Sequence, residues 1–160
     1  MTSGTRSKSA SSAQQAQRQE WLAILAQASP EQVADALRAI APLPSYTLLR
    51  APESGMVMLR GRAGGSGRRF NLGEATVTRC SVKVEGGAVG HGYVLGRSSQ
   101  HAEQAALLDA LLQDPSCHRD LWATVIAPLA EMRAAERDGK ARKTAATRVD
   151  FFTMVRGESQ

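Results

Sequence analysis

The sequence predicts an α+β fold: an antiparallel sheet with helices packed on one face, an N-terminal helix pair and a C-terminal strand. Three observations support this prediction. Apolar and polar residues alternate, as they do in strands, over about residues 46–95. Apolar residues recur at helical spacing on both sides of that segment. The chain closes with a β-prone run at residues 149–156, which predicts the last strand.

The 160-residue length is that of one domain, and the composition changes near residue 18. Residues 1–18 are rich in Ser, Gln and Thr with scattered cations, so they bury too little surface to offset the entropy of ordering. We therefore expect a disordered polar tail over 1–18 and a single domain over 19–160. Because there is no run of about 18 apolar residues, we expect no membrane span. Cys80 and Cys117, without CxxC spacing, predict a reduced cytoplasmic protein without a structural zinc.

Two short helices are expected to open the domain. The first helix is predicted from an apolar patch at residues 21–25. The second has a capping-box start, with Ser29 as the N-cap, Pro30 at the first helical position and Gln32 three residues after the cap. Pro42 ends it.

The middle of the chain predicts short antiparallel strands at about residues 46–50, 56–62, 76–84 and 88–95. Residues 52–55, Pro-Glu-Ser-Gly, read as a turn between the first two, and Glu-Gly-Gly at 85–87 as a hairpin connection. Gly90 and Gly92 leave one face of the last strand flat. That face suits another backbone or a partner lying close against it.

Helices are expected again after the sheet, at about residues 99–113 and 117–129, with Pro128 as a kink or stop. Residues 131–146 are helix-prone and mostly solvated. His91 is interpreted as a half-buried strand residue and His118 as a turn residue, neither of them catalytic.

The positive charge is concentrated in the middle of the chain. Residues 50–100 hold eight cations and three acids, which accounts for the whole net charge of +5. This imbalance favours an anionic partner that meets the middle segment. Aromatic residues make up only 4% of the chain, which disfavours a single-stranded nucleic-acid binder that stacks bases on aromatic rings.

Two stretches of this segment could bind phosphate. The loop from Gly64 to Arg69 is neither a Walker A nor a dinucleotide fingerprint, so it is either a flexible connection or a phosphate cradle flanked by two arginines. The stretch from Gly96 to Glu103 enters a helix, whose N-terminus attracts anions, and Arg97 could add a bidentate contact. The alternative is that Ser98 or Ser99 only caps the helix while Arg97 is solvated. His101 could equally be a packed, hydrogen-bonded histidine.

Four blocks of sequence carry a family resemblance: GGSGRRFNLGEATVTRCSVKV, GYVLGRSSQHAEQAALLDALLQ, IAPL and RVDFFTMVRG. In order and spacing they resemble the PhnG subunit family of the bacterial carbon–phosphorus lyase core complex, across roughly residues 21–157. The resemblance implies a subunit required, with PhnH, PhnI and PhnL, for transfer of the ribose 5-triphosphate of MgATP to methylphosphonate with release of adenine. The chain alone is not expected to be catalytic, and the alternative is a purely structural adaptor without substrate contact.

The same resemblance implies the partners and cofactors. PhnH, PhnI and PhnJ are the expected partner subunits, with the ATPases PhnK and PhnL as possible further ones, and neither nucleic acid nor a membrane is expected. The iron–sulfur cluster and S-adenosylmethionine belong to PhnJ, and two cysteines could not hold such a cluster. We expect no cofactor and no metal bound by this chain alone.

An Arg-rich β segment that ends at a helix N-terminus suits a triphosphate or a phosphonate, although neither the residues nor the resemblance identifies a catalytic group. The candidate substrate- or phosphate-binding residues are Gly65, Arg68, Arg69, Arg79, Arg97, Ser98, His101 and Glu103. The C-terminal block is apolar and specific, and we expect it to pack against another subunit by adding a strand. Its candidate interface residues are Val149, Phe151, Phe152, Met154 and Arg156.

Overall fold

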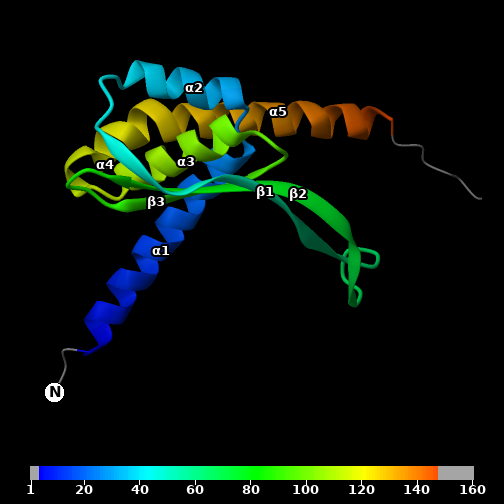
Figure 1. The fold of residues 1–160 in the computed structure, drawn as a ribbon. Coiled ribbons are helices and arrows are strands. Elements are labelled where there is room, and N and C mark those ends of the chain that lie inside the picture. The colour runs from blue at the N-terminus through cyan, green and yellow to red at the C-terminus, as the bar shows by residue number, and fades with distance from the viewer. Residues whose placement is uncertain (1–3, 148–160) are drawn as a thin grey trace, which may run out of the picture.

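The computed structural model of the chain describes the backbone of residues 4–147 and the side chains of residues 12–147. Helices α1 and α2 precede a three-stranded sheet, and helices α3, α4 and α5 follow it, with a π-helical segment, η1, between the last two (Figure 1). Their bounds are α1 Gly4–Gln27, α2 Pro30–Ala39, β1 Tyr46–Arg62, β2 Arg69–Val84, β3 Val89–Leu95, α3 Ser99–Leu112, α4 Pro115–Leu121, η1 Trp122–Ile126 and α5 Ala127–Ala146.

The sheet is antiparallel in the order β1-β2-β3, with helices packed against one of its faces, which confirms the predicted fold class (Figure 1). On β2 the predicted alternation holds, since Cys80, Val82 and Val84 are buried while Arg79 and Lys83 are exposed. The hairpin connection at Gly86 has the positive φ of 68° expected of a tight turn. The predicted C-terminal strand and its interface residues lie outside the described residues.

The turn predicted at residues 52–55 was wrong, because β1 runs unbroken from Tyr46 to Arg62. The register of β1 against β2 shifts twice near this point, between Leu48 and Arg50 and between Arg50 and Glu53. Such bulges absorb residues that do not fit the ladder, and an edge strand tolerates a proline there because its missing N–H is not needed. β2 likewise begins at Arg69, well before the predicted residue 76.

Two expectations about helices also differ from the structure. Helix α1 begins at Gly4, so it covers most of the segment expected to be a disordered tail, and Arg18 from that segment contacts α3. Pro128 does not end a helix: it lies in the first turn of α5, directly after the π-helical segment. The N–H of Ala127 bonds to the carbonyl of Trp122, five residues earlier, so the π-helical pattern ends directly before the proline, which has no N–H to donate.

The smallest residues of the sheet allow the closest packing. Gly90 and Gly92 of β3 lie directly against α3, where a Cβ atom would collide with the carbonyl oxygens of Ala106 and Ala102, respectively. The flat face predicted for this strand is therefore covered by the chain's own helix. Leu108 and Leu112 of α3 are fully buried in the core that this contact closes.

Asp109 of α3 joins three elements through one buried carboxylate. Arg18 donates to both of its oxygens, at 3.1 and 2.7 Å, and the indole N–H of Trp21 donates at 2.9 Å. The backbone N–H of His91 in β3 adds a fourth hydrogen bond at 2.8 Å. A buried charge is stable only when it is paired and hydrogen-bonded, so this carboxylate fixes both α1 and β3 to α3.

We expect Asp109→Ala to destabilise the fold by about 3–5 kcal/mol, because the change leaves the Arg18 charge and two N–H groups without their acceptor. Urea unfolding followed by circular dichroism measures this loss. Asp138→Ala, at an exposed position of α5, is the control and should change stability by less than about 0.5 kcal/mol. Equal unfolding midpoints for the two variants would contradict the role assigned to Asp109.

Candidate functional site

The structure divides the predicted phosphate-binding residues among three places. Gly65, Arg68 and Arg69 lie at the far end of the β1–β2 hairpin, and Arg79 lies on β2 opposite Tyr93. The others, Arg97, Ser98, His101 and Glu103, lie at the start of α3. The backbone N–H of Gly96, just before α3, donates a hydrogen bond to the carbonyl of Thr76 in β2. Arg69 is therefore separated from the start of α3 by roughly 23 Å of strand, at about 3.3 Å per residue. These residues do not form one site within the chain.

The glycine loop is a closed turn that joins β1 to β2. Gly64 and Gly65 have φ values of 57° and 82°, which glycine adopts without strain. The N–H of Gly67 donates to the carbonyl of Ala63 at 2.8 Å, and Arg62 Nη1 donates to the carbonyl of Gly67 at 3.2 Å. The N–H of Gly65 also donates inside the turn, to the carbonyl of Arg62 at 3.4 Å, so the geometry favours a connection over a phosphate cradle.

The start of α3 is the better anion site. Ser98 is the N-cap, and its hydroxyl accepts a hydrogen bond from the N–H of His101 at 3.2 Å. A cap at Ser98 was one of the alternatives that the sequence left open. Gly96 has a φ of 92° and is held by the Thr78 hydroxyl, which donates to its carbonyl at 2.7 Å. Arg97 is exposed beside this helix end and has no hydrogen bond or ion pair within the described part of the chain.

His101 is a packed core residue. Its side chain is buried, and Nε2 bonds to the carbonyl of Leu25 at 2.9 Å, which attaches the end of α1 to α3. Since a carbonyl only accepts, Nε2 carries the proton of this bond. The interpretation as a hydrogen-bonded structural histidine is confirmed, and the ring does not face the anion site at Arg97.

Arg79 is already occupied by a carboxylate. Its Nε donates to Glu53 Oε1 at 2.6 Å across the β1–β2 ladder, and Arg50 Nη1 lies 3.3 Å from the same oxygen. Two guanidiniums share one carboxylate, so a net positive charge remains on this exposed face of the sheet. His91 is on this side too, exposed rather than half-buried as expected, and its Nδ1 pairs with the Ser81 hydroxyl at 2.9 Å.

Glu103 faces a tyrosine rather than a cation. The hydroxyl of Tyr46 donates to Glu103 Oε1 at 2.7 Å at the edge of a cavity of about 470 Å³ between α2, α3 and β1. This hydrogen bond, with burial and the carboxylate charge, raises the pKa of Tyr46 to about 12. Gln104 lines the same cavity, and its buried Oε1 has no hydrogen-bond partner in the described chain. The cavity therefore presents the unbonded acceptor of Gln104 beside the Glu103 carboxylate, together with the Arg38 guanidinium and the Gln100 amide, so its lining is of mixed character.

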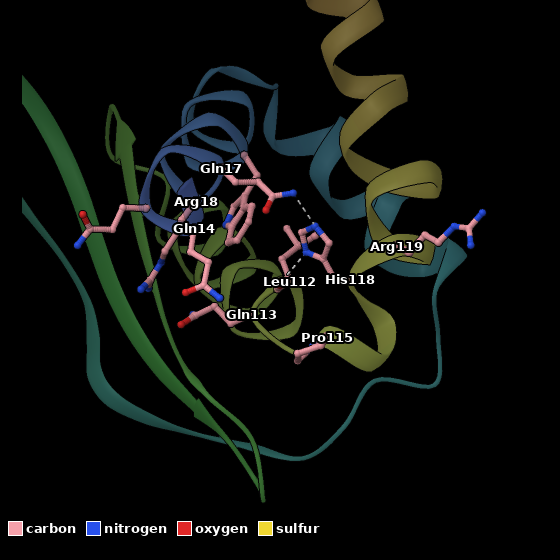
Figure 2. A pocket seen from close by; sticks show the side chains of 10 residues that line it. Gln14, Gln17, Arg18, Leu112, Gln113, Pro115, His118 and Arg119 are labelled. Carbon is pink, nitrogen blue, oxygen red and sulfur yellow. Dashed lines mark hydrogen bonds between the residues drawn. The ribbon is translucent and has the colours of Figure 1, made fainter. Parts of the chain in front are cut away.

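A second cavity, of about 520 Å³, lies between α1 and the start of α4 (Figure 2). His118 stands at its wall, and it belongs to α4 rather than to the expected turn. Its Nδ1 bonds to the carbonyl of Leu112 at 2.7 Å, and its Nε2 lies 3.0 Å from the amide nitrogen of Gln17. The ring also contacts Trp21 and Trp122, with centroids 5.5 and 5.8 Å away.

His118 is structural in this arrangement, because both ring nitrogens are occupied. Amide side chains, including Gln14 and Gln113, line much of the remaining cavity, and Arg119 points away from the other labelled side chains (Figure 2). Such a wall can hold a polar ligand by hydrogen bonds, but it contains no pair of groups suited to acid–base catalysis. Sequence reasoning missed this cavity.

Nothing in the described part of the chain groups three or more His, Cys, Asp or Glu side chains in a way that could hold a metal ion. Cys80 is buried and Cys117 half-buried, and burial raises the pKa of both thiols, so neither is an activated nucleophile. Within the described residues, no helix is long and apolar enough to cross a membrane.

Comparisons with known proteins give a consistent result. Residues 16–157 match the family described as phosphonate metabolism protein PhnG. The chain is also 48% identical over 143 residues to a Rhizobium meliloti (strain 1021) protein named alpha-D-ribose 1-methylphosphonate 5-triphosphate synthase subunit PhnG. That alignment covers 89% of this chain and 91% of the relative, so it spans the sheet, its long hairpin and the start of α3.

We expect Glu103→Gln to lower the pKa of Tyr46 from about 12 toward the ordinary value of about 10, because the charged acceptor is removed. The raised pKa means that the protonated Tyr46 stabilises the folded state. This contribution is fully present below about pH 10 and is lost as the pH rises toward about 12.

Absorbance of the tyrosinate ion measures this titration in a Tyr93→Phe background, where Tyr46 is the one remaining tyrosine. Glu136→Gln, on the exposed side of α5, is the control and should leave the titration unchanged. A Tyr46 pKa that is the same in both variants would show that the hydrogen bond to Glu103 does not hold in solution.

Proposed function

The chain belongs to the PhnG family of phosphonate metabolism proteins, and from this premise we propose that it is a subunit of an alpha-D-ribose 1-methylphosphonate 5-triphosphate synthase. The synthase joins the ribose 5-triphosphate of ATP to methylphosphonate and releases adenine. The extent of the similarity supports the proposal. The chain and the relative are 48% identical over about nine-tenths of each, so we expect them to share the same fold throughout.

The proposed partners are PhnH, PhnI and PhnJ, with PhnK and PhnL as further components. MgATP and the phosphonate are substrates of the assembled complex, while the iron–sulfur cluster and S-adenosylmethionine belong to PhnJ. ATP as a substrate, together with two free cysteines, supports a cytoplasmic location.

Within the subunit, we propose that the start of α3 is the place that meets the triphosphate. Arg97 is exposed beside a helix N-terminus, and the Thr78 and Ser98 hydrogen bonds hold that corner in position. The helix dipole and a free guanidinium both favour an anion there. Because the other predicted phosphate residues lie elsewhere or are already bonded, the rest of the substrate site would come from partner subunits.

A second candidate, a structural adaptor that never contacts substrate, is favoured by that same dispersal. His101 is buried, Glu103 is bonded to Tyr46, and Arg79 is paired with Glu53. If Arg97 makes no contact in the complex, the role of the chain is to hold other subunits in place.

Omission of this chain tests the proposed function. The synthase should be assembled from its purified subunits with and without the chain, and adenine release from MgATP and methylphosphonate should be measured. We expect the complete set to elute as one large species in size-exclusion chromatography and to release adenine, and the incomplete set to do neither. A chain that remains a separate monomer in the presence of all the other subunits would overturn the proposal.

Arg97→Ala distinguishes substrate contact from the adaptor role. A hydrogen bond to a charged group contributes about 1.5–3 kcal/mol, so kcat/KM for adenine release should fall by about tenfold to a hundredfold in a complex of normal size. Arg137→Ala, which removes an exposed arginine from α5, should leave the rate unchanged. If Arg97→Ala also leaves it unchanged, the adaptor role is the correct one.

A further inference from the structure

The outer half of the β1–β2 hairpin extends away from the rest of the chain. We call this segment, residues 56–75, the β-arm. Among the described residues, β3 pairs with β2 only between Val77 and Lys83, so each strand of the β-arm has only the other as its neighbour there. Figure 1 shows the two strands bending away from the helices and ending beyond them.

The β-arm exposes large apolar side chains to solvent. Met56 is 70% exposed, Leu72 65% and Phe70 46%, and Met58 and Leu59 are exposed as well. A two-stranded ribbon without a packed face is only marginally stable in water. Contiguous exposed apolar residues generally mark a surface that another molecule covers.

The two faces of the β-arm differ in chemistry. A Cβ added at Gly61 would lie 3.6 Å from the Phe70 ring and 3.8 Å from the Cβ of Leu72, so these two side chains share one face. Arg60 and Arg62 alternate with Gly61 and therefore project from the other face. One face of the β-arm therefore carries Phe70 and Leu72, and the other, which we call the cationic face, carries the arginines and, by the same alternation, Met56 and Met58.

The arginines of the β-arm form no ion pair within the described chain, and the one acid of the segment, Glu74, leaves most of their charge unbalanced. The β-arm contains four arginines and one glutamate, a net charge of +3. Arg62 and Arg69 lie directly opposite each other in the ladder. Like charges in directly opposite positions destabilise a strand pair, so an acidic surface placed against them would relieve this repulsion.

We propose that the β-arm is a docking element that inserts into an acidic, apolar-lined groove of a protein partner. The inference rests on the proposed function in that the partner is another subunit of the synthase. Carboxylates of the groove face Arg60, Arg62 and Arg69, while its apolar wall receives Phe70 and Leu72. The contact combines charge pairing with burial of apolar side chains.

The composition of the β-arm favours a protein over the other anionic partners. Phe, Met and Arg are enriched in the cores of protein interfaces, and the β-arm supplies all three. Nucleic-acid interfaces are more polar and use aromatic stacking, for which the β-arm has one ring. A second copy of this chain would offer the arginines a surface of the same net positive charge, so it does not supply the counter-charge that this face of the β-arm lacks.

The test uses the full-length chain and the remaining purified subunits of the synthase. Arg60→Glu/Arg62→Glu/Arg69→Glu reverses the cationic face, and Phe70→Ser/Leu72→Ser removes the apolar anchors. Arg137→Glu/Lys140→Glu/Arg142→Glu makes the same change of charge on the exposed part of α5 and is the control. Affinity is measured by isothermal titration calorimetry at low and high salt.

We expect both β-arm variants to bind the other subunits at least tenfold more weakly, the control to bind normally, and wild-type affinity to fall as salt rises. Because the β-arm packs against no helix, its variants should retain the melting temperature of the wild type. Hydrogen exchange on the wild-type complex is a second measurement, in which β-arm amides should become protected.

Normal binding by both β-arm variants, or β-arm amides that stay unprotected in the complex, would overturn the inference while leaving the proposed function intact. Failure of the wild-type chain to bind any synthase subunit would overturn the proposed function itself. β-arm-dependent binding to a single-stranded RNA oligonucleotide, with subunit binding unaffected, would assign the β-arm to nucleic acid and also overturn the inference.

Discussion

The buried carboxylate of Asp109 is the interaction on which the arrangement of the helices around the sheet depends. It accepts hydrogen bonds from Arg18 and Trp21 of α1 and from the backbone of β3, while its own helix packs on the sheet. An unpaired charge in this position would be strongly destabilising, so the three elements are stable only together. His101 reinforces the same joint from the other end of α3 by its bond to Leu25.

The helices pack closely on only part of the sheet, and the outer part of the β1–β2 hairpin lies beyond them. Because Gly90 and Gly92 let α3 lie on the backbone of β3, the core takes its buried strand residues from short stretches of β2 and β3 alone. β1 and β2 are much longer than β3, and their remaining length has no helix to cover it. Four of the eight cations of residues 50–100 therefore belong to a projecting ribbon that contributes little to the core, where they are free to contact another molecule.

The candidate site shows what local sequence can and cannot predict. The β2 alternation depends on residues a few positions apart and was predicted correctly, whereas the Ser98 cap and the packing of His101 were each one of two alternatives that the sequence left open. Whether Arg69 and Arg97 act together depends on the path between them. Adjacent strands can return distant residues to one place, but here roughly 23 Å of β2, at about 3.3 Å per residue, lies between them and keeps them apart.

The sequence by itself determined the helices, the antiparallel hairpin, the buried face of β2 and the concentration of positive charge, because periodicity, capping and composition are local properties. The sequence also places Asp109 among the leucines of an apolar helix, which indicates a buried carboxylate. It does not identify the hydrogen-bond partners of that carboxylate in α1 and β3. Only the tertiary structure decided that β1 continues through Pro52, that α1 extends into the polar N-terminal segment, and that the arginines occupy separate places. Those outcomes depend on pairings between residues far apart in the chain, whose free energies no local pattern encodes.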